Sequence, residues 1–171
     1  MPNLRDIKRR ISSVQNTKQI TRTMEMVATA KIRHATERIT AATPYAETMR
    51  KTLADVASQS TYIDNPLLME HEVKKNALAI VIVSDRGLAG GFNSNVFRMV
   101  EHYIAANSKA DIKTDVIICG KKANGYFRYR HIEPVLAYSD LSADPTLAQA
   151  REISSYVRAR YLEGTADEVK V

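Results

Sequence analysis

The sequence predicts an α/β protein: one long N-terminal coiled-coil helix followed by a Rossmann-like domain with a mainly parallel sheet. Residues 3–58 contain no glycine and a single proline, Pro44, so they offer few points where a helix would break. All six glycines lie after residue 86, where apolar runs of strand length alternate with amphipathic segments. We therefore expect a helical stalk over 1–58, a connector over 59–76 and an α/β globular domain over 77–171.

The first segment carries an apolar seam at coiled-coil spacing. Steps of three and four residues from Leu4 reach sixteen positions, of which thirteen are apolar. The seam consists of Leu4, Ile7, Ile11, Val14, Lys18, Thr21, Glu25, Ala28, Ile32, Ala35, Ile39, Ala42, Ala46, Met49, Leu53 and Val56. A helix of this length spans roughly 80 Å, which exceeds the diameter of a small domain. We expect a partner helix from another chain or from a part of this protein outside the sequence.

The middle of the seam is polar. Lys18, Thr21 and Glu25 occupy seam positions there, while an apolar stripe made of Ile20, Met24 and Val27 runs beside them. Polar seam residues can simply set the register of a coiled coil. The other interpretation is that this zone contacts further subunits. Pro44 is expected to bend the helix without ending it, because the seam resumes at Ala46 in the same register.

Positive charge is confined to the start of the chain. Residues 1–40 hold nine Lys or Arg and three Asp or Glu, whereas the remainder holds sixteen of each. The basic residues could form a solvated face, a DNA-binding region or a docking stripe for acidic protein loops. The apolar seam runs through these residues and would bury the face that should meet DNA. We therefore favour protein over nucleic acid as the partner.

The second part of the chain predicts alternating strands and helices. Residues 77–83 form a continuous apolar run, typical of a strand covered on both faces. The expected elements after it are a glycine-rich turn at 84–95, a helix carrying Val96, Met99, Val100 and Ile104, a strand at 115–119, a short basic helix at 121–130 and an edge strand or extended segment within 131–138.

The last predicted helix covers residues 146–161 and ends before Gly164. Its expected inward side consists of Leu147, Ala150, Ile153, Val157 and Tyr161. A final strand begins at Glu168 and reaches the last residue, so we expect the chain to be part of a longer protein. The repeated strand–helix units predict parallel strands joined by right-handed crossovers.

The glycine-rich turn invites a nucleotide-binding hypothesis, because it joins a strand to the N-terminus of a helix. Gly87, Gly90 and Gly91 do not make the dinucleotide pattern, and no phosphate-loop Lys-Ser or Lys-Thr pair follows them. We instead expect a tight turn that presents Arg86, with Asp85 as a structural residue that caps the turn.

The remaining reactive residues give no catalytic or metal pattern. His34, His71, His102 and His131 lack metal-ligand spacing, and Cys119, the only cysteine, lies in an apolar strand where burial is expected. No apolar run reaches the ~20 residues that cross a bilayer, and the N-terminus lacks a signal-peptide core. We expect a soluble, intracellular chain with no cofactor, no metal and no catalytic site of its own.

Three stretches resemble the gamma subunit of F-type ATP synthases. They are LRDIKRRI at 4–11, NTKQITRTMEMVATAK at 16–31 and SDRGLAGG at 84–91. The resemblance covers essentially the whole chain, and the first two stretches are highly specific in combination. It implies a long C-terminal helix, antiparallel to the first, that lies outside this sequence and would cover its seam.

The resemblance implies a rotor rather than an enzyme. Such subunits form a central stalk that turns inside a ring of three alpha and three beta subunits and couples the transport of hydrogen ions or sodium ions to ATP synthesis or hydrolysis. Their globular base rests on the epsilon subunit and the membrane ring of c subunits. This implies a peripheral location on the cytoplasmic face of the bacterial plasma membrane, or the equivalent mitochondrial or plastid membrane.

The resemblance also supplies candidate partner-binding residues. The segment that contains Lys18, Arg22, Met24, Met26 and Lys31 matches a zone that faces acidic beta-subunit loops, and Arg86 matches an arginine presented to beta. Together with the neighbouring basic residues, the predicted set is Arg9, Arg10, Lys18, Arg22, Met24, Met26, Lys31, Arg33 and Arg86.

Overall fold

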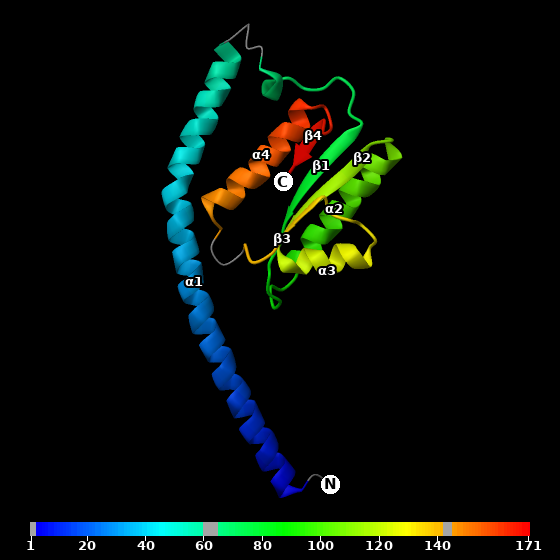
Figure 1. Cartoon of the computed structure of the whole chain (residues 1–171). Helices are drawn as coiled ribbons and strands as arrows, with labels where there is room; N and C mark the ends of the chain where they lie inside the picture. The colour runs from blue at the N-terminus through cyan, green and yellow to red at the C-terminus, as the bar shows by residue number, and fades with distance from the viewer. Residues whose placement is uncertain (1–2, 60–64, 142–144) are drawn as a thin grey trace. The chain divides into compact units, whose positions relative to one another are not determined.

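The computed structural model describes residues 3–59, 65–141 and 145–171 (Figure 1). Residue contacts divide the chain into two compact units, Met1–Ile63 and Asp64–Val171. The first unit holds helix α1, Leu4–Gln59, and the second holds a parallel sheet with its covering helices. The α/β class predicted from the sequence is therefore confirmed.

Helix α1 is 56 residues long and continues through Pro44. At its start the carbonyl of Asn3 accepts hydrogen bonds from the amides of Asp6 and Ile7, at 2.8 and 3.2 Å. Pro44 lacks an amide donor, but its carbonyl accepts the hydroxyl of Thr48 at 2.8 Å. The prediction that Pro44 does not end the helix is correct.

The apolar seam of α1 is exposed along its length. Every α1 side chain from residue 4 to residue 58 is exposed, and the exposed fraction is 67% at Val14, 66% at Ile32 and 58% at Leu53. Threonine hydroxyls on the same helix, such as those of Thr21 and Thr29, donate to the carbonyl four residues earlier. Since helix stability comes mainly from packing an apolar face, this seam is an apolar surface on which another helix can pack.

The domain is built on four parallel strands in the order β3-β2-β1-β4. The strands are β1 (Asn76–Ile82), β2 (Lys113–Cys119), β3 (Leu136–Tyr138) and β4 (Glu168–Lys170). Strand β1 pairs with β2 over its whole length, whereas β4 pairs only with Ala77–Ala79. Strand β3 lies at the edge, as the proline in its segment predicts.

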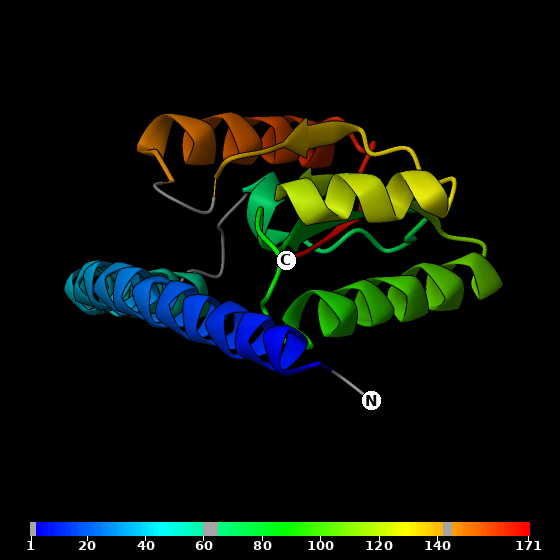
Figure 2. The same ribbon diagram turned by 90° about the horizontal axis from the view of Figure 1, so that it is seen from below.

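Helices cover the two faces of the sheet (Figure 2). Helices α2 (Phe92–Lys109) and α3 (Lys121–Tyr129) lie on one face, and α4 (Leu147–Leu162) lies on the other. The strand side chains alternate between two cores, as the pleat of a strand requires. The first core includes Val81, Ile118, Phe97 and Phe127; the second includes Leu78, Ile117, Ile153 and Val157.

The segment before β1 is fastened to the C-terminal end of α4. It contains a single turn of 3₁₀ helix, η1, Pro66–Leu68. The hydroxyl of Tyr161 donates to the carbonyl of Met69 at 2.6 Å, and the ring of His71 stacks on that of Tyr161 with centroids 4.6 Å apart. These contacts hold Met69 and His71 against α4.

Helix α4 differs from its prediction at its first turn. The helix begins at Leu147, and the preceding Thr146 forms a capping box with Gln149. Gly164 adopts a left-handed conformation with φ 68° after the end of the helix. Ile153 and Val157 pack inward as expected. Leu147 and Ala150 are exposed, so their predicted inward position is wrong. Within the described residues, α4 packs on the sheet through its middle and leaves its first turn uncovered.

Candidate partner-binding site

The predicted partner-binding residues of α1 are all exposed, but the helix divides them between two sides. Lys18, Arg22 and Met26 follow one another at four-residue steps, so they lie on one side of the helix. Arg33 lies on the same side, and all four line one shallow depression of the helix surface. We refer to these four residues as the Lys18 face.

The other predicted residues do not join the Lys18 face. Met24 and Lys31 are seven residues apart and share the opposite side of α1 with Arg9, because 3.6 residues make one turn. Arg10 lies between the two sides, next to the seam. The sequence prediction treated these residues as one group. The helix instead presents two basic stripes, so a single flat partner surface cannot meet both.

The charged residues of the Lys18 face differ in whether a carboxylate lies beside them. Arg33 pairs with Glu37 through Nε and Oε1 at 2.9 Å, and His34 lies 3.7 Å from the same carboxylate. These exposed pairs contribute little to stability. Within the described part of the chain, neither Lys18 nor Arg22 has a carboxylate partner. Both charges are therefore available to an acidic partner.

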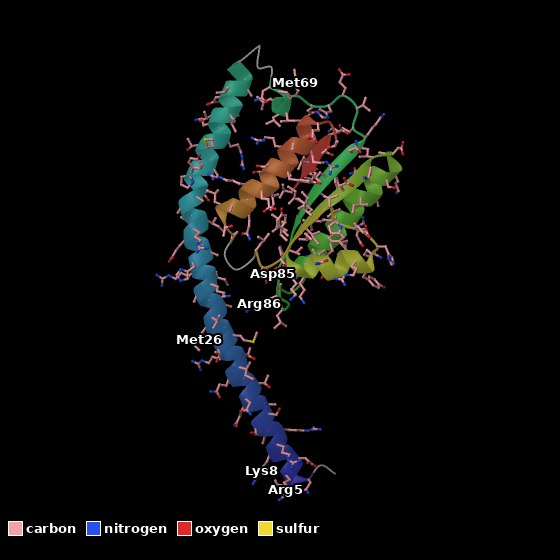
Figure 3. The ribbon with its side chains drawn as sticks, viewed as in Figure 1. Arg5, Lys8, Met26, Met69, Asp85 and Arg86 are labelled. Atoms are coloured by element: carbon pink, nitrogen blue, oxygen red, sulfur yellow. The ribbon has the colours of Figure 1, made fainter. Side chains whose placement is uncertain are left out.

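Arg86 lies in the turn of residues 84–91, which we call the Arg86 turn, at the carboxyl end of β1 (Figure 3). Its side chain is exposed, and so is that of Leu88, which is 92% exposed and has a left-handed backbone with φ 62°. The base of the turn is fixed: the hydroxyl of Ser84 donates to the carbonyl of Arg86 at 2.6 Å. The prediction of a tight turn that presents Arg86 agrees with this geometry.

The sequence suggested that Asp85 is a structural residue of this turn, and its described hydrogen bonds reach two other loops. Its Oδ1 atom accepts hydrogen bonds from the amides of Lys121, at 2.8 Å, and Asp140, at 3.0 Å. Lys121 is the first residue of α3, so the carboxylate satisfies a helix N-terminal amide. Sequence reasoning missed this role because the two donors lie 36 and 55 residues away along the chain.

The strand order reverses between β1 and β4, and many α/β proteins bind nucleotides at such a reversal. A cavity of about 460 Å³ beside these strands is mostly apolar, lined by residues that include Ile80, Met99 and Tyr103. Lys170 is the one charged residue among its described lining residues, and it lies 3.2 Å from Glu168. The lining of this cavity is therefore apolar apart from one paired lysine.

The remaining reactive residue types in the described part of the chain are dispersed or buried. No group of three or more His, Cys, Asp or Glu side chains in this part of the protein could hold a metal ion. Cys119 is buried at the end of β2, and burial raises the pKa of its thiol, so it is not poised as a nucleophile. No described helix combines the length and apolar character needed to cross a membrane.

Comparison with known proteins assigns the family. A family model described as ATP synthase matches residues 3–171. The "ATP synthase gamma chain" of Moorella thermoacetica is 40% identical over 171 residues, and those of Leptospira biflexa and Bdellovibrio bacteriovorus are 36% and 38% identical. These alignments cover 100% of this chain and 58–59% of the relatives, so the chain spans about three fifths of their length. The match from residue 3 to residue 171 shows that the chain belongs to the ATP synthase family.

Proposed function

We propose that this chain forms part of the central-stalk rotor subunit of an F-type ATP synthase, which couples ion-driven rotation to ATP synthesis or hydrolysis. The observation that carries the proposal is α1: 56 residues of helix whose apolar seam and basic stripes are exposed. An exposed seam of this length needs neighbouring helices, and exposed positive charge suits an acidic ring around it. The gamma-chain relatives support the same assignment.

The proposed partners of α1 are the alpha and beta subunits of the catalytic ring. The Lys18 face contacts acidic loops of one beta subunit, while Met24 and Lys31, on the opposite side, contact a different neighbour. Coupling requires that each angle of the stalk has a different contact energy with open and closed beta subunits, because equal energies would shift no equilibrium. A helix with two unlike basic sides provides such asymmetry.

We propose that residues 1–58 act as the stalk and 77–171 as the base. Residues 59–76 form the connector, which packs on the base through Met69 and His71. The base rests on the epsilon subunit and the membrane ring of c subunits, and a C-terminal helix outside this sequence covers the seam. The subunit has no catalytic site of its own and binds no cofactor, metal or nucleic acid. It lies at the cytoplasmic face of the bacterial plasma membrane, as the bacterial origin of the relatives supports.

Charge reversal on the Lys18 face tests the proposal. Lys18→Glu with Arg22→Glu, introduced into the gene for the full protein, should leave assembly intact but lower ATP-driven proton pumping per ATP hydrolysed in vesicles. Both side chains are exposed, so the change places like charges against the acidic ring without altering the fold. Arg5→Glu is the control, because Arg5 is also exposed and, at 3.6 residues per turn, lies roughly 100–140° around α1 from Arg22 and Lys18. Unchanged pumping in the double variant rejects this contact.

Two alternative functions make different predictions. A nucleotide-binding α/β protein would bind ATP or NAD when purified, and the parallel sheet alone is compatible with that function. A basic coiled-coil adaptor would bind DNA with a steep dependence on salt concentration. We expect neither activity, and either result at physiological ionic strength would count against a rotor.

A further inference from the structure

The carboxylate of Asp85 joins three loops at one end of the sheet. Asp85 follows β1, Lys121 follows β2 and Asp140 follows β3, and the amides of the latter two donate to the same Oδ1 atom at 2.8 and 3.0 Å. Asp140 has a left-handed backbone, with φ 63°. Hydrogen bonds to a carboxylate are stronger than those between neutral groups. This single side chain therefore sets the spacing between the Arg86 turn and two neighbouring loops.

A second set of hydrogen bonds holds the residue before Asp85. Asn93, in the first turn of α2, accepts the amide of Ser84 at 3.1 Å and donates to its hydroxyl at 2.8 Å. Ser84 in turn donates to the carbonyl of Arg86. The backbone on each side of Asp85 is thus fixed, to α2 through Ser84 and to the α3 and β3 loops through Asp85 itself.

The tip of the Arg86 turn is more exposed than its base. Arg86, Gly87 and Leu88 are exposed, although Ser84 and Asp85 below them are half-buried. A rigid base under an exposed arginine reduces the conformational entropy that binding would otherwise cost. We propose that Asp85 is a positioning residue that holds Arg86 in the orientation required to dock on a partner's carboxylate. This inference rests on the proposed function, in which Arg86 contacts the catalytic ring.

The proposal is tested by two measurements on the assembled complex. Asp85→Ala should raise hydrogen exchange at the amides of Lys121 and Asp140 about tenfold, because each loses a charge-assisted hydrogen bond. It should also lower the number of protons pumped per ATP to the level of Arg86→Ala. If Asp85 acts through Arg86, the variant that carries both Asp85→Ala and Arg86→Ala should pump as many protons per ATP as Arg86→Ala alone.

Conservative and control variants separate positioning from other roles. Asp85→Asn keeps an Oδ1 acceptor, so it should retain most of the coupling, whereas a direct charge contact with a partner would be lost in both variants. Glu133→Ala removes an exposed carboxylate that has no hydrogen bond or ion pair within the described residues, and it should change neither measurement. If Asp85→Ala does not fold, Asn93→Ala loosens the same turn from α2 and should show the same non-additivity with Arg86→Ala.

The outcomes distinguish this proposal from the proposed function. If Arg86→Ala loses coupling, two results overturn the positioning role alone. One is an additive loss of coupling in the variant that carries both substitutions, and the other is unchanged amide exchange in Asp85→Ala. Full coupling in Arg86→Ala overturns the docking role of Arg86 and the inference built on it. Faster exchange together with non-additive loss of coupling establishes the positioning role.

Discussion

Asp167 and His71 lie 96 residues apart in the chain and meet in the fold, with Asp167 Oδ1 2.7 Å from His71 Nδ1. The other carboxylate oxygen, Oδ2, accepts the amides of Lys75 and Asn76, each at 2.8 Å. The hydrogen bond with His71 is the strongest influence on the pKa of Asp167; burial opposes it and the two amides reinforce it. The result is a pKa of about 2, below the ordinary value of 3.8. Asp167 is therefore an ionised anchor for the segment before β1.

The contribution of Asp167 to the stability of the domain should be lost in acid. A carboxylate whose folded-state pKa is lowered contributes fully above pH 3.8 and loses its contribution as the pH falls towards 2. Asp167→Asn should therefore lower the free energy of unfolding by about 2 kcal/mol at pH 7, and the difference from the wild type should vanish near pH 2. Urea unfolding at a series of pH values measures this difference.

The matched control is Asp111→Asn. Asp111 is exposed, and within the described residues its carboxylate has no hydrogen bond or ion pair; asparagine also tolerates its left-handed backbone at φ 58°. Its stability should follow the wild type at every pH. A constant difference between Asp167→Asn and the wild type down to pH 2 would refute the assigned pKa.

Gly120 should tolerate no side chain. It lies between β2 and α3 with φ 121°, and a Cβ atom placed there would be 2.2 Å from the carbonyl oxygen of Val83. Gly120→Ala should lower the free energy of unfolding by about 3 kcal/mol or more, because the backbone must shift as well as the dihedral angle. Gly125→Ala is the control: this glycine lies inside α3 with open space around it, and alanine there should stabilise by about 0.5–1 kcal/mol. Thermal unfolding of both variants checks the contrast.

The sequence predicts the elements of this fold well, because each follows from local pattern. The apolar run that becomes β1 and the glycine-free repeat that becomes α1 are periodic signals that need no tertiary information. Leu147 shows the limit of this reasoning. Its spacing fits the inward side of α4, yet it is 66% exposed, because spacing does not reveal where the covering sheet ends.

The site was only partly predictable for a related reason. The identity of Arg86 and of the α1 residues came from motifs, but their grouping depends on helix geometry, which separates Lys18 from Met24. The bonds from Asp85 to Lys121 and Asp140, and from Asp167 to His71, join residues far apart in the chain. No periodicity encodes such pairs, since they form only when strands β1 to β4 align.

Cys119 should be unreactive in the folded protein. It is 4% exposed at the end of β2, and burial raises the pKa of its thiol. The thiolate is the reactive form, so alkylation at pH 8 should be at least about a hundredfold slower than that of a small free thiol. The rate should rise to the free value in denaturant, which serves as the internal control. Rapid alkylation of the native protein would show that β2 opens readily or that the thiol is accessible.

The exposed seam of α1 should make the 171-residue chain self-associate when it is purified without partners. Ile39 is a seam residue, 65% exposed, and burying it against a second copy should contribute about 1.5–3 kcal/mol. Ile39→Asn should therefore weaken association at least about tenfold in sedimentation equilibrium. Ala41→Asn introduces the same side chain two residues later, on the opposite side of the helix, and should leave association unchanged. A fully helical monomer at every concentration tested would mean that the seam needs no partner, and the rotor proposal would lose its main support.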